Sequence, residues 1–132
     1  MKLLRNEYAT KNFKWKELEC KCGKGCGLNG IGQARYIQDE HLQKLQILRD
    51  LLGPISLSSV SRCPKHNQVV GGVPLSMHRS TITRPARAAD VIIGRYNKHD
   101  IIHAAEEAGF MGIGVNYRTF VHVDNRPRRA RW

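Results

Sequence analysis

Apolar and polar positions along the chain predict two amphipathic helices. Leucines recur at steps of three and four residues over residues 38–52, while lysine and arginine occupy positions between them. A Gly-Pro pair follows and ends this helix. A second helix is predicted over residues 98–108, where apolar side chains form one face, with Asn97 as its N-cap and Gly109 after its last turn.

Three further segments carry strand patterns. Residues 55–60 alternate apolar and polar side chains, and residues 88–93 and 119–124 are short stretches rich in β-branched residues. Residues 61–87 form a long irregular stretch, of a length that small domains use for functional or disordered loops. This order of elements predicts an α+β fold, a small single domain over residues 1–132 with an antiparallel sheet packed by helices.

The N-terminal part is predicted to contact the core through three apolar anchors, Phe13, Trp15 and Leu18. Five glycines then predict a loop over residues 20–32. Three of the four cysteines lie in this loop with C-x-C-x3-C spacing, which differs from paired C-x2-C zinc motifs: Cys20, Cys22 and Cys26, with Cys63 further along. Free, partly buried thiols, a disulfide formed after release from the cytoplasm, and a second, structural zinc all remain open.

The charge is the unusual feature of the composition. Lys and Arg total 22 against 11 for Asp and Glu, a net charge of +11, so the surface should concentrate near polyanions. Nucleic acid, the anionic bacterial wall and outer-membrane lipids are all candidates. Part of the excess lies in residues 126–132, which are equally compatible with a solvated, frayed terminus. The start shows no secretory signal, and no apolar run approaches a membrane span, so we expect synthesis in the cytoplasm and no integral membrane segment.

Six histidines are present, and most need no functional account. Three on or beside the predicted helices are expected to be solvated, namely His41, His99 and His103. His66 lies in the long loop and is expected to be positional. His78 ends a loop segment, while Asp90 and His122 lie within apolar strands, where an unpaired carboxylate would be costly to bury. If they converge, these three side chains form a His/Asp/His zinc site with one coordination position left open.

The stretch Ser59–Asn67 followed by Val70–His78 resembles the central segment of the M15 family of zinc peptidases. That family shows S-x-x-R-[SC]-P-x-x-N, then V-G-G-x-P-x-S-x-H, then G-x-A-x-D, and closes on [FW]-[VI]-H-[VI]-D, which is Phe120–Asp124 here. The resemblance takes in Phe13–Cys26 and the helix Leu42–Leu52, and so covers most of the chain. It implies the fold of D-Ala-D-Ala carboxypeptidases and Hedgehog-like zinc peptidases, and one catalytic zinc on His78, Asp90 and His122.

Two departures from the family pattern bear on the chemistry. His78 and Asp90 are twelve residues apart instead of seven, which places an insertion of about five residues within Arg79–Pro85, and Ala86 replaces the motif glycine. Thr119 stands where many relatives carry a carboxylate base. Asp124 lies two residues after His122 on the same strand face, so it could serve as the base or orient His122, and both roles stay open.

The resemblance implies zinc-dependent hydrolysis of a peptidoglycan peptide bond, as in murein endopeptidases, D,D-carboxypeptidases and phage lysis enzymes. Arg62 is a candidate anchor for a substrate carboxylate or the oxyanion, or an ordinary loop arginine, and Ser76 shapes the loop before His78 or bonds near the metal. We expect a monomer whose partners are peptidoglycan peptides and an anionic cell-wall or outer-membrane surface, reached after release or in a phage virion.

Two other classes of protein remain. One is an inactive wall-binding module of the same fold, in which the insertion has removed activity. The other is a basic nucleic-acid-binding protein with a cysteine zinc site. Nucleic acid is the weaker hypothesis, because it leaves the His/Asp/His pattern without purpose and the chain lacks a basic stripe interleaved with aromatics.

Overall fold

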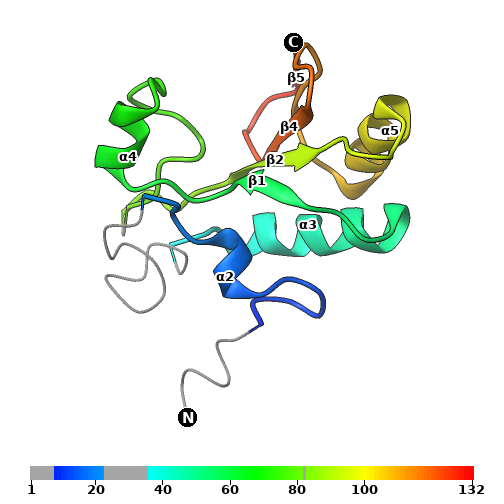
Figure 1. Cartoon of the computed structure of the whole chain (residues 1–132), viewed down its shortest axis with the longest axis horizontal. Helices are drawn as coiled ribbons and strands as arrows, with labels where there is room; N and C mark the ends of the chain where they lie inside the picture. The colour runs from blue at the N-terminus through cyan, green and yellow to red at the C-terminus, as the bar shows by residue number, and fades with distance from the viewer. Residues whose placement is uncertain (1–7, 23–35, 82) are drawn as a thin grey trace.

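The computed structural model describes residues 8–22, 36–81 and 83–132, and its centre is a five-stranded sheet (Figure 1). The strands are β1 (Leu57–Ser59), β2 (Ala88–Ile92), β3 (Gly112–Gly114), β4 (Phe120–Asp124) and β5 (Ala130–Arg131), in the order β1-β2-β4-β3-β5. The β1/β2, β2/β4 and β3/β4 pairs are antiparallel, and β3/β5 is parallel. The α+β prediction is confirmed, with one parallel pair at the edge of the sheet.

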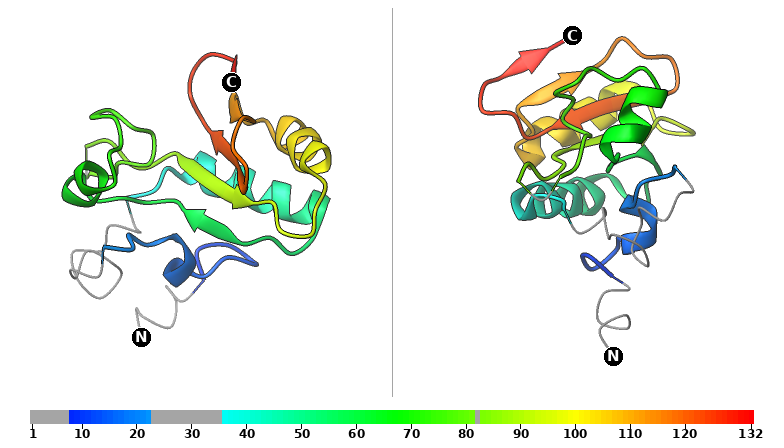
Figure 2. Two further views of the ribbon diagram at one scale, coloured as in Figure 1. Left: turned by 45° about the horizontal axis from the view of Figure 1, so that its top comes forward. Right: turned by 90° about the vertical axis from the view of Figure 1, so that its left-hand side faces the viewer.

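The two long helices are confirmed as α3 (Asp39–Leu52) and α5 (Lys98–Ala108). They pack against each other and against the sheet (Figures 1 and 2). The side chain of Asn97 accepts a hydrogen bond from the backbone N–H of His99, as an N-cap does. The described part of the chain contains no helix with the length and apolar character needed to cross a membrane.

The alternation of side chains along β2 and β4 gives the sheet two different faces. Val91 pairs with Val121 and Ala89 with Val123, and these side chains join the core shared with α3 and α5. Because side chains alternate along a strand, Asp90, His122 and Asp124 project from the opposite face. The polar residues of the strands therefore lie together on the face away from the long helices.

The sequence patterns did not predict the two short helices. The helix α2 (Trp15–Leu18) contacts β1, and the predicted anchors Phe13 and Leu18 are fully buried. The helix α4 (Pro64–Val69) lies inside the stretch that was expected to be irregular, and its only buried residue is polar, so no apolar periodicity marks it. Most of the predicted loop over residues 20–32, with Cys26, lies outside the described residues.

The C-terminal tail is not frayed, contrary to one of the two interpretations of its sequence. Residues of β5 add to the edge of β3, where Ala130 N–H donates to Met111 O at 2.9 Å and Trp132 N–H donates to Ile113 O at 3.2 Å. Backbone pairing with a neighbouring strand explains this order, because the tail itself has no apolar pattern.

The solvated assignment holds for His99 and His103, which are exposed, and is wrong for His41. His41 is fully buried and its ring contacts Phe110 edge-on, with 5.5 Å between the ring centroids. The reason is helical periodicity: His41 lies four residues before Leu45 and seven before Leu48, on the buried face of α3.

Candidate metal centre

The register of the sheet brings two of the three predicted ligands together. Asp90 on β2 lies directly opposite His122 on β4, and His122 Nδ1 is 3.0 Å from Asp90 Oδ1. His78 reaches the same carboxylate oxygen from the preceding loop, with its Nε2 3.2 Å away. One ligand atom from each of the three residues lies within 4.8 Å of the others, a grouping suited to a metal ion. His78 and Asp90 are buried and His122 is half-buried.

The insertion between His78 and Asp90 does not separate these two residues. The loop is fastened to the strand side of the site by two backbone hydrogen bonds, from Arg62 N–H to His78 O at 2.8 Å and from Ser80 N–H to Arg62 O at 2.7 Å. Beyond Ser80 the chain turns back on itself where the backbones of Thr81 and Arg84 bond each other. The described part of the insertion therefore contains a turn, and His78 still reaches Asp90.

The outer nitrogen of each histidine ring has its own acceptor. His78 Nδ1 is 2.9 Å from the carbonyl oxygen of Val60, and His122 Nε2 is 2.8 Å from Asp124 Oδ2. Because a carbonyl and an ionised carboxylate only accept, these two nitrogens carry the ring protons. The inner nitrogens, His78 Nε2 and His122 Nδ1, then direct their lone pairs at Asp90.

Two nitrogen lone pairs and a carboxylate oxygen repel one another unless a proton or a metal ion lies between them. Where protons fill this place, burial raises the pKa of the Asp90 carboxyl, but the hydrogen bonds with His122 and His78 that then form outweigh burial and hold that pKa below its usual range. Burial lowers the pKa of His122, but its bonds with Asp124 and Asp90 outweigh burial and raise it. The cluster therefore attracts a positive charge, and two imidazole nitrogens with one carboxylate oxygen form a donor set that suits zinc.

Asp124 is fully buried behind His122, and four hydrogen bonds occupy its carboxylate. Oδ2 accepts from His122 Nε2 and from Arg126 Nη2 at 2.6 Å, and Oδ1 accepts from the Nε and backbone N–H of Arg126 at 2.8 and 3.2 Å. Burial raises the pKa of Asp124, but the bonds from Arg126 and His122 outweigh it and hold that pKa below its usual range. Asp124 is therefore a fixed anion.

Residues that the sequence did not single out complete this arrangement. Gly112 lies opposite Asp124, and a Cβ at Gly112 would overlap the Asp124 carboxylate and the Arg126 guanidinium. Trp132 in the tail contacts His122 with its ring tilted by 50° and 5.2 Å between the ring centroids, and the Arg126 guanidinium lies over the indole, 4.5 Å from its centroid. The Gly-Ile-Gly sequence of β3 was an available signal, because paired glycines in a strand indicate close approach of neighbouring groups.

Arg62 and Ser76 have defined contacts near the centre. Arg62 donates from Nε to Ser59 Oγ at 3.3 Å and from Nη1 to Asn67 Oδ1 at 3.1 Å, and Ser59 pairs with Asp90 across the sheet. Arg62 also lines a cavity of about 200 Å³ whose other walls are Lys21, Ser58, Ser59, Ser61, His66 and Val70. Ser76 Oγ accepts from the backbone N–H of His78 at 3.2 Å, so it shapes the turn that delivers His78.

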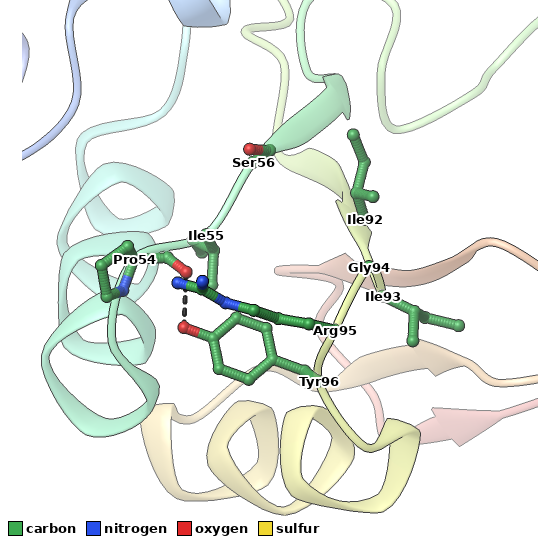
Figure 3. A pocket seen from close by; sticks show the side chains of 8 residues that line it. All are labelled: Pro54, Ile55, Ser56, Ile92, Ile93, Gly94, Arg95 and Tyr96. Atoms are coloured by element: carbon green, nitrogen blue, oxygen red, sulfur yellow. Dashed lines mark hydrogen bonds between the residues drawn. The ribbon is translucent and has the colours of Figure 1, made fainter.

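A second cavity lies away from this chemistry. It is lined by Pro54–Ser56 and by the end of β2 with the residues that follow it, and Figure 3 shows the Tyr96 hydroxyl donating a hydrogen bond to Pro54 O. None of the three predicted metal ligands lines it. Asp100, at the start of α5, borders another surface cavity between α3 and α5, among residues that take no part in the centre.

Comparison with protein families gives one match over most of the chain. The model of the family described as Peptidase M15 matches residues 11–124, which include all three candidate ligands. Among curated proteins, no sequence similar to this chain is found.

Proposed function

Because the chain belongs to the peptidase M15 family, we propose that it is a zinc-dependent peptidase that cuts a peptide bond in bacterial peptidoglycan, as an endopeptidase or a D,D-carboxypeptidase. One observation carries the metal assignment. His78 Nε2, Asp90 Oδ1 and His122 Nδ1 converge, while the outer nitrogen of each ring is held by an acceptor of its own. Anchored rings of this kind are typical of histidines that ligate zinc.

The three ligands would hold one zinc ion, which when bound supplies Lewis acidity that polarises a carbonyl and makes water a better nucleophile at neutral pH. The protein's contribution is orientation. Val60 O fixes the ring of His78, and Asp124 fixes the ring of His122 in the tautomer that leaves Nδ1 unprotonated. The Asp124 carboxylate that accepts from Nε2 also raises the basicity of the His122 ring, which makes Nδ1 a stronger metal ligand.

We assign Asp124 the orienting role and not that of the base. Its four accepted hydrogen bonds come from His122 and Arg126, and they occupy both carboxylate oxygens. A group that takes a proton from water needs an accessible lone pair, and Asp124 is fully buried. Arg126 keeps Asp124 ionised and therefore acts on the metal centre through it.

Arg62 is proposed to anchor the substrate. Its guanidinium lines the cavity beside β1, and Ser59 and Asn67 hold it in place. Stem peptides of peptidoglycan carry carboxylates, and a positioned guanidinium suits a carboxylate better than any other side chain. The net charge of +11 would favour approach to the anionic wall.

The test measures zinc content and wall hydrolysis together. His122→Ala should lose the zinc ion of the catalytic centre and should no longer reduce the turbidity of isolated cell walls. His103→Ala, a change at an exposed histidine on α5, should retain both that ion and the activity. Mass spectrometry of the released fragments identifies the bond that is cut. Wall hydrolysis that persists in His122→Ala would refute the metal mechanism. Zinc-loaded wild-type protein that cleaves other peptides but not walls would refute the substrate.

A further inference from the structure

Two neighbouring cysteines of the N-terminal segment meet a third cysteine that precedes α4. Cys20 follows α2, Cys22 lies two residues later, and Cys63 immediately precedes α4. Their sulfur atoms all lie within 4.8 Å of one another. Cys20 and Cys63 are buried and Cys22 is half-buried, and none of these three described cysteines forms a disulfide.

Backbone donors are directed at two of these sulfurs. The N–H of Cys63 donates to Cys20 Sγ and the N–H of His66 donates to Cys63 Sγ, each at 3.3 Å. Donors of this kind favour the thiolate, the form that binds metal. Burial outweighs them at Cys20 and raises the pKa of its thiol to about 11, so without a metal the sulfur keeps its proton, and a bound metal ion would replace that proton. Positive side chains are also near: Arg62 lies within electrostatic reach of Cys20, and Lys21 and Arg62 line the same cavity.

From this geometry we propose a second metal site, in which Cys20, Cys22 and Cys63 bind a structural Zn²⁺ ion as thiolates. In a tetrahedral zinc site, sulfurs at about 2.3 Å from the metal lie about 3.8 Å apart, which is compatible with three sulfurs that all lie within 4.8 Å of one another. Three thiolates fill three positions and leave one for a further donor. The chain's fourth cysteine, Cys26, lies outside the described residues and is not part of the proposed site.

A disulfide explains the cluster less well. A disulfide would join two of the sulfurs and leave the third beside them without a role, whereas a zinc ion uses all three. Metal binding also needs no oxidant, whereas a disulfide forms and persists only in an oxidising compartment.

The site would fasten the N-terminal segment to the sheet next to the catalytic centre. Near the cluster, Ser61 N–H donates to Leu18 O at 3.2 Å, so the same two segments already meet through the backbone. Val60, whose carbonyl holds the ring of His78, and Arg62 lie on the segment that ends at Cys63. Metal binding at the cysteines would thus stiffen the support of one catalytic ligand.

The experiment isolates this site from the catalytic one by using the His122→Ala background. The full chain, purified under reducing conditions with zinc, should hold two zinc ions in the wild type and one in His122→Ala. Adding Cys63→Ser to that variant should remove the last zinc, whereas adding Ser61→Ala, a buried change two residues away, should not. Cobalt loaded into His122→Ala should give the near-ultraviolet absorption of thiolate-to-cobalt charge transfer.

If Cys63→Ser fails to fold, a second measurement that needs no cysteine variant tests the same site. Titrating His122→Ala with an organomercurial thiol reagent should release its zinc in step with thiol modification. The proposal is overturned if His122→Ala holds no zinc and gives no thiolate-to-cobalt band, or if mass spectrometry of the native protein finds a disulfide between any two of the three cysteines. Neither outcome bears on wall hydrolysis, so the proposed peptidase function stands or falls separately.

Discussion

Replacing Asp124 by Asn tests how the catalytic centre is oriented. Asn keeps the shape of Asp124 but has one acceptor oxygen and one NH2 group, whereas the site presents donors to both positions, from His122 and from Arg126. If the NH2 group faces His122, the ring must move its proton to Nδ1, the nitrogen that faces Asp90. If it faces Arg126, two donors meet. Either arrangement weakens the hold on His122.

These contacts determine how much zinc affinity and stability Asp124→Asn should lose. Loss of a carboxylate that orients a zinc histidine weakens metal affinity about 10–100-fold, which corresponds to about 1.4–2.7 kcal/mol. Folding should lose about 2–3 kcal/mol as well, because a buried charge pair is broken. The Arg126 side chain is 28% exposed, so water can partly replace the lost partner and keep this cost below that of a fully buried pair.

The assay is competition for zinc with a chromophoric chelator, together with kcat measured at rising zinc concentration. Asp124→Asn should show weaker zinc binding and a kcat that partly recovers with added zinc. Asp100→Asn, on the surface at the start of α5, serves as the matched control and should change neither. A fall in kcat of about 10²–10⁴ with unchanged zinc affinity is the signature of a lost general base, and it would refute the orienting role.

Three further predictions concern other parts of the molecule. Gly112→Ala should lower stability by about 1–3 kcal/mol and weaken zinc binding, because the new Cβ overlaps the Asp124 carboxylate; thermal melts and chelator competition measure both effects. Arg62→Ala should lower kcat/KM about 10–100-fold with zinc content unchanged, and zinc loss would show a structural role instead. Burial and the charge of His78 lower the pKa of His41 from 6.5 to about 3, so between these pH values the unfolded chain binds the proton and the fold does not. The contribution of His41 to the free energy of unfolding should therefore be full above pH 6.5 and should fall by about 4 kcal/mol at pH 3.5. Urea titrations at several pH values should show that the free energy of unfolding of the wild type falls more steeply over this range than that of His41→Leu. An equal pH dependence in the two proteins would contradict this assignment.

The burial of His41 follows from the helical periodicity of α3. The spacing of His41 from Leu45 and Leu48 places it on the apolar stripe of α3, whereas its polar neighbours in sequence suggested solvent. A helix buries the residues that recur every three or four positions on one of its faces. The spacing of a residue from the apolar positions therefore predicts its burial better than the polarity of its neighbours in sequence does. The glycines of β3 are a similar case, because a Cβ at Gly112 would overlap the Asp124 side chain and a Cβ at Gly114 would overlap the Trp132 side chain.

Local pattern in the sequence determined the long helices, the central strands and the three candidate metal ligands. Each of these depends on periodicity or on a motif of neighbouring residues, which the chain carries before it folds. Only the tertiary structure decided that β5 pairs with β3, that Arg126 saturates Asp124, and that Cys63 joins Cys20 and Cys22. These contacts join segments that are distant in sequence or depend on the direction of a side chain. Their partners are specified by strand register and close packing, which no local pattern encodes.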